Sequence, residues 1–130
     1  MPFNDLREYI DHLDANGELL RVTAEVDWNL EIGAITRRSM DLRGPALLFE
    51  NVKDYPGARI FANSLSRNKH LPFSRMAMAL DMDPASTMLE IIQEYARRIP
   101  NLVKPRLVGT APCKENILTG DDIDLFALDR

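Results

Sequence analysis

The chain has a single cysteine, Cys113, in 130 residues. One cysteine excludes an intramolecular disulfide framework and favours a reducing, cytoplasmic compartment. Long apolar runs are absent too, since none approaches the roughly 18 residues of a membrane span. The start Met1-Pro2-Phe3-Asn4-Asp5 has neither the basic nor the apolar region of a signal peptide. We therefore expect neither a signal peptide nor a membrane span.

The chain also lacks an excess of positive charge. Its 16 Lys and Arg residues face 20 Asp and Glu residues, for a formal net charge of -4. Non-specific binding of nucleic acid needs a basic face that neutralises phosphates, so this function is not expected. The six glycines form neither a G-x-G-x-x-G nor a G-x-x-x-x-G-K-[ST] pattern, so both nucleotide-binding fingerprints are absent.

What is present is an ordinary globular composition, 45% hydrophobic and 28% charged. The length predicts a single domain over residues 1–130. The most informative stretch is the apolar run 46–49, which lies between the turn signals Gly44-Pro45 and Asp54-Tyr55-Pro56-Gly57. A run this short predicts a buried strand rather than a helix. A strand buried on both faces needs partners on both, and residues 59–62 are the expected hairpin partner.

Amphipathic helices and one more strand are predicted around this run. Alternation over 19–26 predicts a strand with Leu20, Val22, Ala24 and Val26 facing inward. Helices are expected over 4–15 with Asn4 as N-cap, from Asp27 or Asn29 to Leu42, over 72–80, and from Asp83-Pro84 to Ile99. For the last helix the predicted inner stripe is Leu89, Ile92, Ala96 and Ile99, with a second stripe of Met88, Ile91 and Tyr95. The predicted class is α+β, a small mixed or antiparallel sheet with amphipathic helices packed on it.

The remaining residues give weaker predictions. Residues 102–108 are expected to be extended, 113–118 to form a last strand, and 119–122 to form a turn. The apolar tail that follows is typical of a chain cut short, whose side chains await a packing partner; it comprises Ile123, Leu125, Phe126 and Leu128.

Few residues are candidates for chemistry. Asp121, Asp122 and Asp124 could bind a metal ion, but no calcium-loop Gly or distal Glu is in register, so a solvated turn is favoured. His12 lies four residues after Glu8, which favours a surface pair over a catalytic base. His70, in a basic run, could contact a phosphate or an acidic partner, although a solvated loop is favoured.

Other candidates have structural explanations that we favour. Cys113 next to Lys114 is expected to be a structural thiol. Trp28 is expected to anchor against the core, and Arg37 and Arg38, with Glu31, to form a charged helix exterior rather than an anion clamp. The methionines are expected to fill the core rather than to form an adaptable contact surface; they are Met76, Met78, Met82 and Met88.

The order of several blocks resembles a known family. The blocks are Asp5-Leu6-Arg7, 16–22, Glu25-Val26-Asp27 with Leu30-Glu31-Ile32, 44–53, and 113–125. Together they resemble the N-terminal domain of the UbiD-like decarboxylases, the family of 3-polyprenyl-4-hydroxybenzoate decarboxylase. The resemblance covers nearly all 130 residues, and the blocks 44–53 and 118–125 are its more specific parts.

The resemblance implies a much longer parent enzyme that uses prenylated FMN with a divalent metal, typically Mn²⁺, and often K⁺. Such enzymes reversibly decarboxylate aromatic or α,β-unsaturated acids and are commonly homo-oligomers. The family's catalytic and metal-binding residues lie in a central domain that would follow Arg130, and the tail 119–130 would lead toward it. The resemblance therefore assigns no catalytic, cofactor-binding or metal-binding residue to this chain, whose own activity stays uncertain.

Two functions follow from these expectations. The first is the N-terminal, non-catalytic module of such a decarboxylase, whose partners are the cofactor and C-terminal domains. The alternative is a stand-alone subunit-assembly or interaction domain without chemistry, for which the apolar tail and the methionines would form the docking surface.

Overall fold

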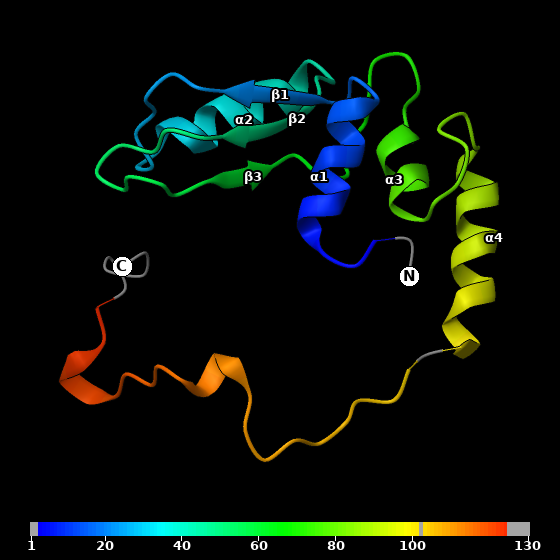
Figure 1. The fold of residues 1–130 in the computed structure, drawn as a ribbon. Helices are drawn as coiled ribbons and strands as arrows, with labels where there is room; N and C mark the ends of the chain where they lie inside the picture. Colours follow the sequence, from blue (N-terminus) through cyan, green and yellow to red (C-terminus); the bar gives the residue numbers. More distant parts are fainter. Residues whose placement is uncertain (1–2, 102, 125–130) are drawn as a thin grey trace.

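The computed structural model describes residues 3–101 and 103–124. Its centre is a three-stranded sheet in the order β1-β2-β3, formed by β1 (Leu19–Val22), β2 (Ala46–Phe49) and β3 (Ile60–Ala62). β1 pairs with β2 in parallel and β3 pairs with β2 antiparallel. The helix α2 (Glu31–Asp41) lies behind the sheet in Figure 1, and α1 (Leu6–Ala15) and α3 (Ser74–Ala79) lie at its right-hand end. The predicted α+β class with a small mixed sheet is confirmed.

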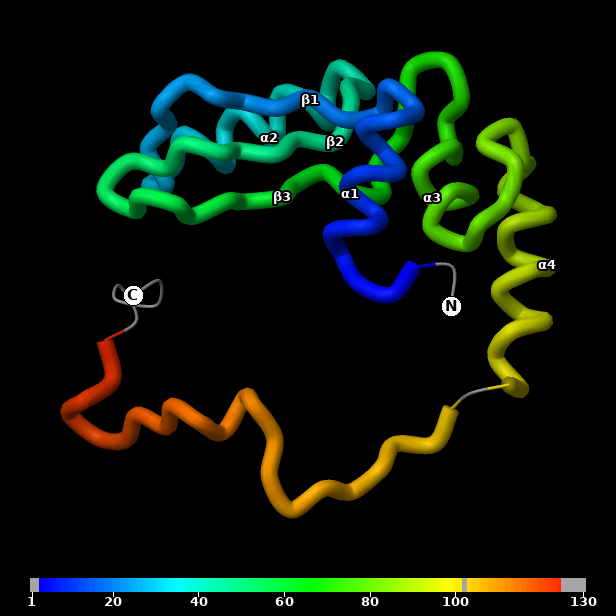
Figure 2. Tube along the Cα trace, viewed as in Figure 1, coloured from blue at the N-terminus to red at the C-terminus, as the bar shows by residue number. Residues whose placement is uncertain are grey.

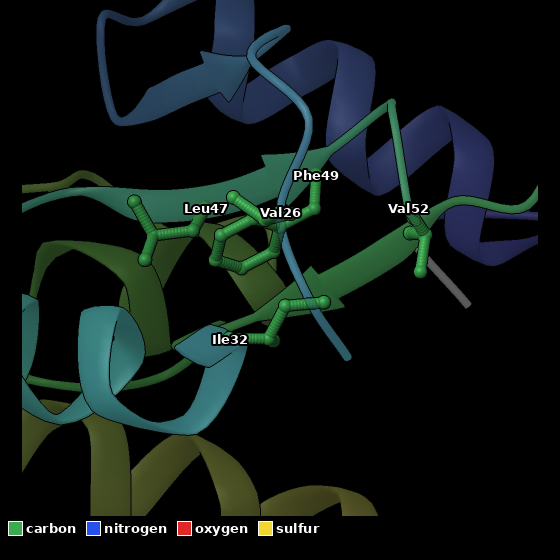
Figure 3. Close-up of a cluster of buried hydrophobic side chains, with 5 residues drawn as sticks. All are labelled: Val26, Ile32, Leu47, Phe49 and Val52. Atoms are coloured by element: carbon green, nitrogen blue, oxygen red, sulfur yellow. The ribbon is translucent and has the colours of Figure 1, made fainter. Parts of the chain in front are cut away.

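The strand β2 is buried over its whole length, as predicted. Leu47 and Phe49 point into a cluster with Val26, Ile32 and Val52, beside α2 (Figure 3). Ala46, on the opposite face, packs in a second cluster with residues of α1 and α3, namely Tyr9, Leu13 and Met78. Because side chains alternate along a strand, β2 is covered by α2 on one face and by α1 on the other.

The first strand is shorter than predicted. β1 ends at Val22, and Val26 returns to the sheet only through an isolated bridge to Val52. Leu20, predicted to face inward, is 51% exposed, and Ala24 is exposed as well. β1 is an edge strand in this sheet and has a neighbour on one side only, which leaves Leu20 partly uncovered.

Two predicted helix starts are displaced by one to three residues. Asp5, not Asn4, caps α1, since its carboxylate accepts hydrogen bonds from the backbone N–H groups of Arg7 (2.8 Å) and Glu8 (3.0 Å). The first residue of α2 follows Leu30, which has a φ of 71° and makes no side-chain cap. Asp27 instead closes a local turn by accepting from the N–H of Asn29 at 2.9 Å.

The last long helix, α4 (Met88–Arg98), begins at Thr87 rather than at Asp83-Pro84. Thr87 and Glu90 form a reciprocal capping box, which fixes this start more firmly than the turn at Asp83. The predicted inner stripe is also wrong, because Leu89 and Ile92 are exposed while Ile91 is buried. Of the second predicted stripe, Ile91 is buried and Met88 half-buried, while Tyr95 is 60% exposed, so only the first turns of that stripe pack on the domain.

Beyond α4 the chain runs through short 3-10 turns, η1 (Ile99–Asn101), η2 (Pro112–Lys114) and η3 (Gly120–Asp122). The predicted strand over 113–118 is wrong, since Pro112 starts a 3-10 turn there and the sheet of the described residues consists of β1, β2 and β3. Figure 2 shows this orange and red segment running away from α4 and below the sheet. Leu102 and the tail residues Leu125, Phe126 and Leu128 lie outside the described residues. Within the described part of the chain, no helix has both the length and the apolar character that crossing a membrane requires.

Candidate functional site

A hollow of about 640 Å³ lies between α1 and the face of the sheet that α2 does not cover. Leu48 and Phe61, from β2 and β3, contribute apolar surface to it. Because strand alternation turns Leu48 away from the α2 face, the sheet itself forms this surface. The charged and apolar residues that line the hollow come from the first turns of α1 and from all three strands or their ends; they are Asp5, Leu6, Arg7, Ile10, Asp11, Arg21, Leu48, Arg59 and Phe61.

The charges around this hollow are largely paired. Arg21 contacts the carboxylates of Asp14 at 2.8 Å and Glu50 at 2.7 Å, and these hydrogen bonds raise its pKa. Arg7 lies 3.5 Å from Asp5. The pKa of Asp5 is lowered, chiefly because it accepts the N–H of Glu8. Among the described residues, the exposed Arg59 is the lining arginine without an ion-pair partner.

This arrangement can hold an anionic group on an apolar floor through Arg59. The lining side chains that could take part in acid-base chemistry are the carboxylates of Asp5 and Asp11; histidine, cysteine and serine do not occur among the described lining residues.

A buried ion pair that was not predicted joins the chain after α1 to α3. Nη1 of Arg75 lies 2.9 Å from Oε2 of Glu18, and both side chains are buried. Oγ of Ser74 donates to Oε1 of Glu18 at 2.9 Å, and the amide of Asn68 donates to the same oxygen. The Glu18 carboxylate thus accepts from three side chains, as a buried charge requires.

Tyr9 completes this cluster from α1. Its hydroxyl donates to the carbonyl oxygens of Arg75 at 3.0 Å and Ser64 at 3.2 Å. Burial raises the pKa of Tyr9 to about 12. Of the two nearby charges, that of Arg75 lowers this pKa and that of Glu18 raises it. The hydroxyl therefore remains a protonated donor at neutral pH. The cluster ties three segments together and is structural in character, because the Glu18 carboxylate and Nη1 of Arg75 bind each other rather than face the hollow beside α1, although the buried Nε of Arg75 has no hydrogen-bond partner in the part of the chain that the structure describes.

Sequence reasoning missed this cluster because its members are far apart in the chain. Glu18 and Arg75 are 57 residues apart, so no local spacing links them. The available signal was Arg75 itself, a lone charge inside the apolar stretch 73–80. A charged residue inside a short apolar helix is typically paired when that helix is buried.

The histidines are not brought together. Glu8 accepts two hydrogen bonds from Asn4, each 2.8 Å, and so the predicted surface pair with His12 does not form. The His12 ring lies 5.4 Å from that of Phe3. His70 is exposed in a loop, where its backbone N–H donates to Asn68 at 2.8 Å.

The predicted solvated turn at Asp121 and Asp122 is present as the exposed η3. In residues 3–101 and 103–124, no group of three acidic, histidine or cysteine side chains could hold a metal ion. Cys113 is exposed in η2 rather than on a strand.

The other candidates have structural roles. Met78 is buried in the core, while Met76 and Met88 are half-buried around a second hollow of about 400 Å³. Arg37 pairs with Asp41 at 3.1 Å on the exterior of α2, as expected of a charged helix face. Trp28 stacks edge-on against Tyr55, with ring centroids 6.1 Å apart, and Tyr55 in turn packs on the core.

Comparison with known proteins gives a consistent result. Residues 10–95 match the sequence model of the 3-octaprenyl-4-hydroxybenzoate carboxy-lyase N-terminal domain. The pyrrole-2-carboxylic acid decarboxylase of Pseudomonas aeruginosa is 38% identical in an alignment of 125 residues, and the match covers 93% of this chain and 25% of that protein.

Two solved structures of the vanillic acid decarboxylase ShVdcCD of Sedimentibacter hydroxybenzoicus are similar to this chain. The closed form has 32% identity and a TM-score of 0.74, and the match covers 95% of this chain and 26% of that one. The open form with truncated ShVdcD has 31% identity and a TM-score of 0.71, with 92% and 25% covered. The chain thus spans about a quarter of the length of the relatives it matches.

Proposed function

The chain belongs to the 3-octaprenyl-4-hydroxybenzoate carboxy-lyase family, the UbiD-like decarboxylases, and from this membership we propose that it is the N-terminal, non-catalytic module of a decarboxylase. The observation that carries the proposal is the share of each protein that the match covers. The chain is matched almost throughout, yet it accounts for a quarter of the Pseudomonas relative. The proposed non-catalytic role is supported by the hollow beside α1, whose described lining has no histidine, cysteine or serine and whose Arg21 is already paired with carboxylates.

The proposed reaction is the reversible, non-oxidative decarboxylation of an aromatic or α,β-unsaturated acid by the whole enzyme. The relatives named for pyrrole-2-carboxylic acid and vanillic acid support this substrate class, since both are aromatic acids. Prenylated FMN, with Mn²⁺ and K⁺ beside it, is the cofactor that the family resemblance implies, and it supplies the electron sink for the loss of carbon dioxide.

The described residues do not fit that cofactor set. They offer no three-ligand metal group, and in the hollow beside α1 a single arginine is left without a carboxylate partner. We therefore assign no cofactor ligand and no chemical step to this chain. In the proposal, the remainder of the enzyme supplies both, and homo-oligomerisation and a cytoplasmic location stay predictions.

A chimeric enzyme tests the proposal directly. This chain would replace the matched N-terminal quarter of the Pseudomonas decarboxylase, and the control would lack that quarter entirely. We expect the chimera to release carbon dioxide from pyrrole-2-carboxylate in cells that make prenylated FMN, and the shortened control to be inactive. A folded, cofactor-loaded chimera without activity would contradict the proposed function.

A stand-alone assembly domain is the second candidate, favoured by the exposed apolar side chains of α4 and of the segment that follows it. This function predicts that the chain binds a separate protein and that the chimera does not work. An active chimera would therefore decide for the decarboxylase module.

A further inference from the structure

Helix α4 carries an apolar stripe that nothing in the described structure covers. The exposed fractions of Leu89, Ile92 and Ile99 are 64%, 55% and 48%, and Ala96 between them is exposed too. Leu89, Ile92 and Ala96 lie at i, i+3 and i+7 of α4, which places them on one helix face, and Ile99, the first residue of η1, follows at i+10; we call these four residues the outer stripe of α4. The other side of the helix packs on the domain through Ile91. The outer stripe has the spacing of a buried helix face, yet it faces solvent.

The charges beside the outer stripe are already satisfied. Glu94 binds Arg97 and Arg98, each at 2.6 Å, and Arg98 also donates to the carbonyl of Leu80. The Glu90 carboxylate is held by Thr87 in the capping box. A nucleic acid or an acidic peptide would have to displace these internal pairs. The surface is therefore suited to an apolar partner.

The segment directly after α4 also exposes apolar side chains to solvent. Val103 is 94% and Leu107 is 99% exposed, and Ile117 and Leu118 are also exposed. In Figure 1 this segment continues from the lower end of α4 away from the sheet. A stretch of this length whose described residues form only two short 3-10 turns is uncommon inside a compact domain, and its exposed apolar residues form a surface that a partner could cover. The outer stripe and this segment are thus consecutive in sequence, and the apolar side chains of both are exposed to solvent.

We propose that the outer stripe of α4 is the surface on which the remaining three quarters of the decarboxylase polypeptide dock. This inference rests on the proposed function and names the docking face within it. A covalently linked domain has an effective concentration in the millimolar range, so a small apolar contact is sufficient to hold it.

A second copy of this chain is a poorer occupant. The stripe spans ten residues of rise, about 15 Å of helix. One helix face of that length buries far less than the roughly 800 Å² per partner of a stable dimer. The size of the stripe therefore favours a partner tethered to the same chain.

The test uses the chimera described above with two variants. Ile92→Glu puts a charge on the outer stripe, while Gln93→Glu puts the same charge next to it on exposed α4 surface. In the chimera we expect Ile92→Glu to speed amide exchange across α4 by at least about tenfold, because a buried unpaired charge opens the contact. Gln93→Glu should leave exchange unchanged. In the isolated 130-residue chain, neither variant should lower Tm, since both positions face solvent there.

Three results would overturn the inference. The first is equal amide exchange in the two chimeric variants. The second is a lower Tm of the isolated chain that carries Ile92→Glu. This result would mean that the stripe is already covered within the chain. The third is a concentration-dependent dimer of the isolated chain that Ile92→Glu dissociates, as sedimentation would show. Decarboxylase activity of the wild-type chimera reports the proposed function separately from amide exchange. A wild-type chimera that does not fold would contradict both.

Discussion

At the scale of the residue, Leu48 and Leu20 offer the sharpest comparison in the sheet. Leu48 is 3% exposed on the central strand, while Leu20 on the edge strand is 51% exposed. We expect Leu48→Ala to lower the free energy of unfolding by about 2–5 kcal/mol, because it removes a buried side chain from the central strand, on the floor of the hollow beside α1. Leu20→Ala is the matched control and should stay within about 0.5 kcal/mol, as surface changes do.

Urea unfolding followed by circular dichroism measures both variants. A loss below about 1 kcal/mol for Leu48→Ala would show that β2 is not the core of the domain. Equal losses of unfolding free energy for the two leucines would show that burial does not determine how much each side chain contributes to stability.

Substitution of Arg75 tests how much the buried ion pair contributes to stability. Arg75→Met removes the cation and leaves the Glu18 carboxylate buried without it, so we expect a loss of about 3–5 kcal/mol. Adding Glu18→Gln should restore part of that loss, because the remaining amide carries no charge and still accepts from Ser74. Arg97→Met, at an exposed pair, should change the unfolding free energy little. A double variant no more stable than Arg75→Met alone would contradict this account of the pair.

At the scale of the element, the stability of α4 is expected to depend on pH. Hydrogen bonds from Arg97, and then from Arg98, lower the pKa of Glu94 from 4.5 to about 2. A lowered folded-state pKa stabilises the helix above pH 4.5, and this contribution disappears as the pH falls toward about 2. We expect amide exchange of α4, corrected for the intrinsic rate, to accelerate across this interval. Glu94→Gln should flatten the profile, and an unchanged profile would mean that the ion pairs contribute nothing to α4.

The elements differ in how well the sequence predicts them. β2 was predictable because turn residues bound an apolar run, and α1 because its periodicity is clear. The packed face of α4 was not, because its two apolar stripes are similar and only contacts with the α3 region distinguish them. The strand predicted over 113–118 failed for a related reason. A strand forms where a partner strand supplies hydrogen bonds, and that information is not local.

The same distinction applies to the candidate site. The polar residues of the hollow beside α1 come from α1, β1 and β3, so only the folded sheet brings them together. The family resemblance, in contrast, was carried by ordered blocks such as 44–53 and needed no three-dimensional information. It predicted the family correctly while leaving the pairing of Glu18 with Arg75 unseen.

At the scale of the whole molecule, the packed domain and the exposed segment should differ in their response to protease. Arg106 and Lys114 lie in the exposed segment, while Lys104 is protected from trypsin by Pro105. We expect brief trypsin treatment to cleave after Arg106 and Lys114 first, because cleavage needs an unfolded stretch of backbone. Arg37, exposed but helical, is the internal control. Early cleavage at Arg37 or at the buried Arg75 would contradict this division of the molecule.

The last prediction concerns cofactor retention by the chain as a whole. Its described residues leave one lining arginine unpaired beside an open hollow, too few fixed groups to retain a flavin phosphate. Native mass spectrometry of the chain, co-expressed with a flavin prenyltransferase, should therefore show the bare protein mass. A retained prenylated FMN would place a cofactor site within these 130 residues. Loss of that mass in an Arg59→Gln variant, but not in Arg38→Gln, would then locate the site in the hollow beside α1.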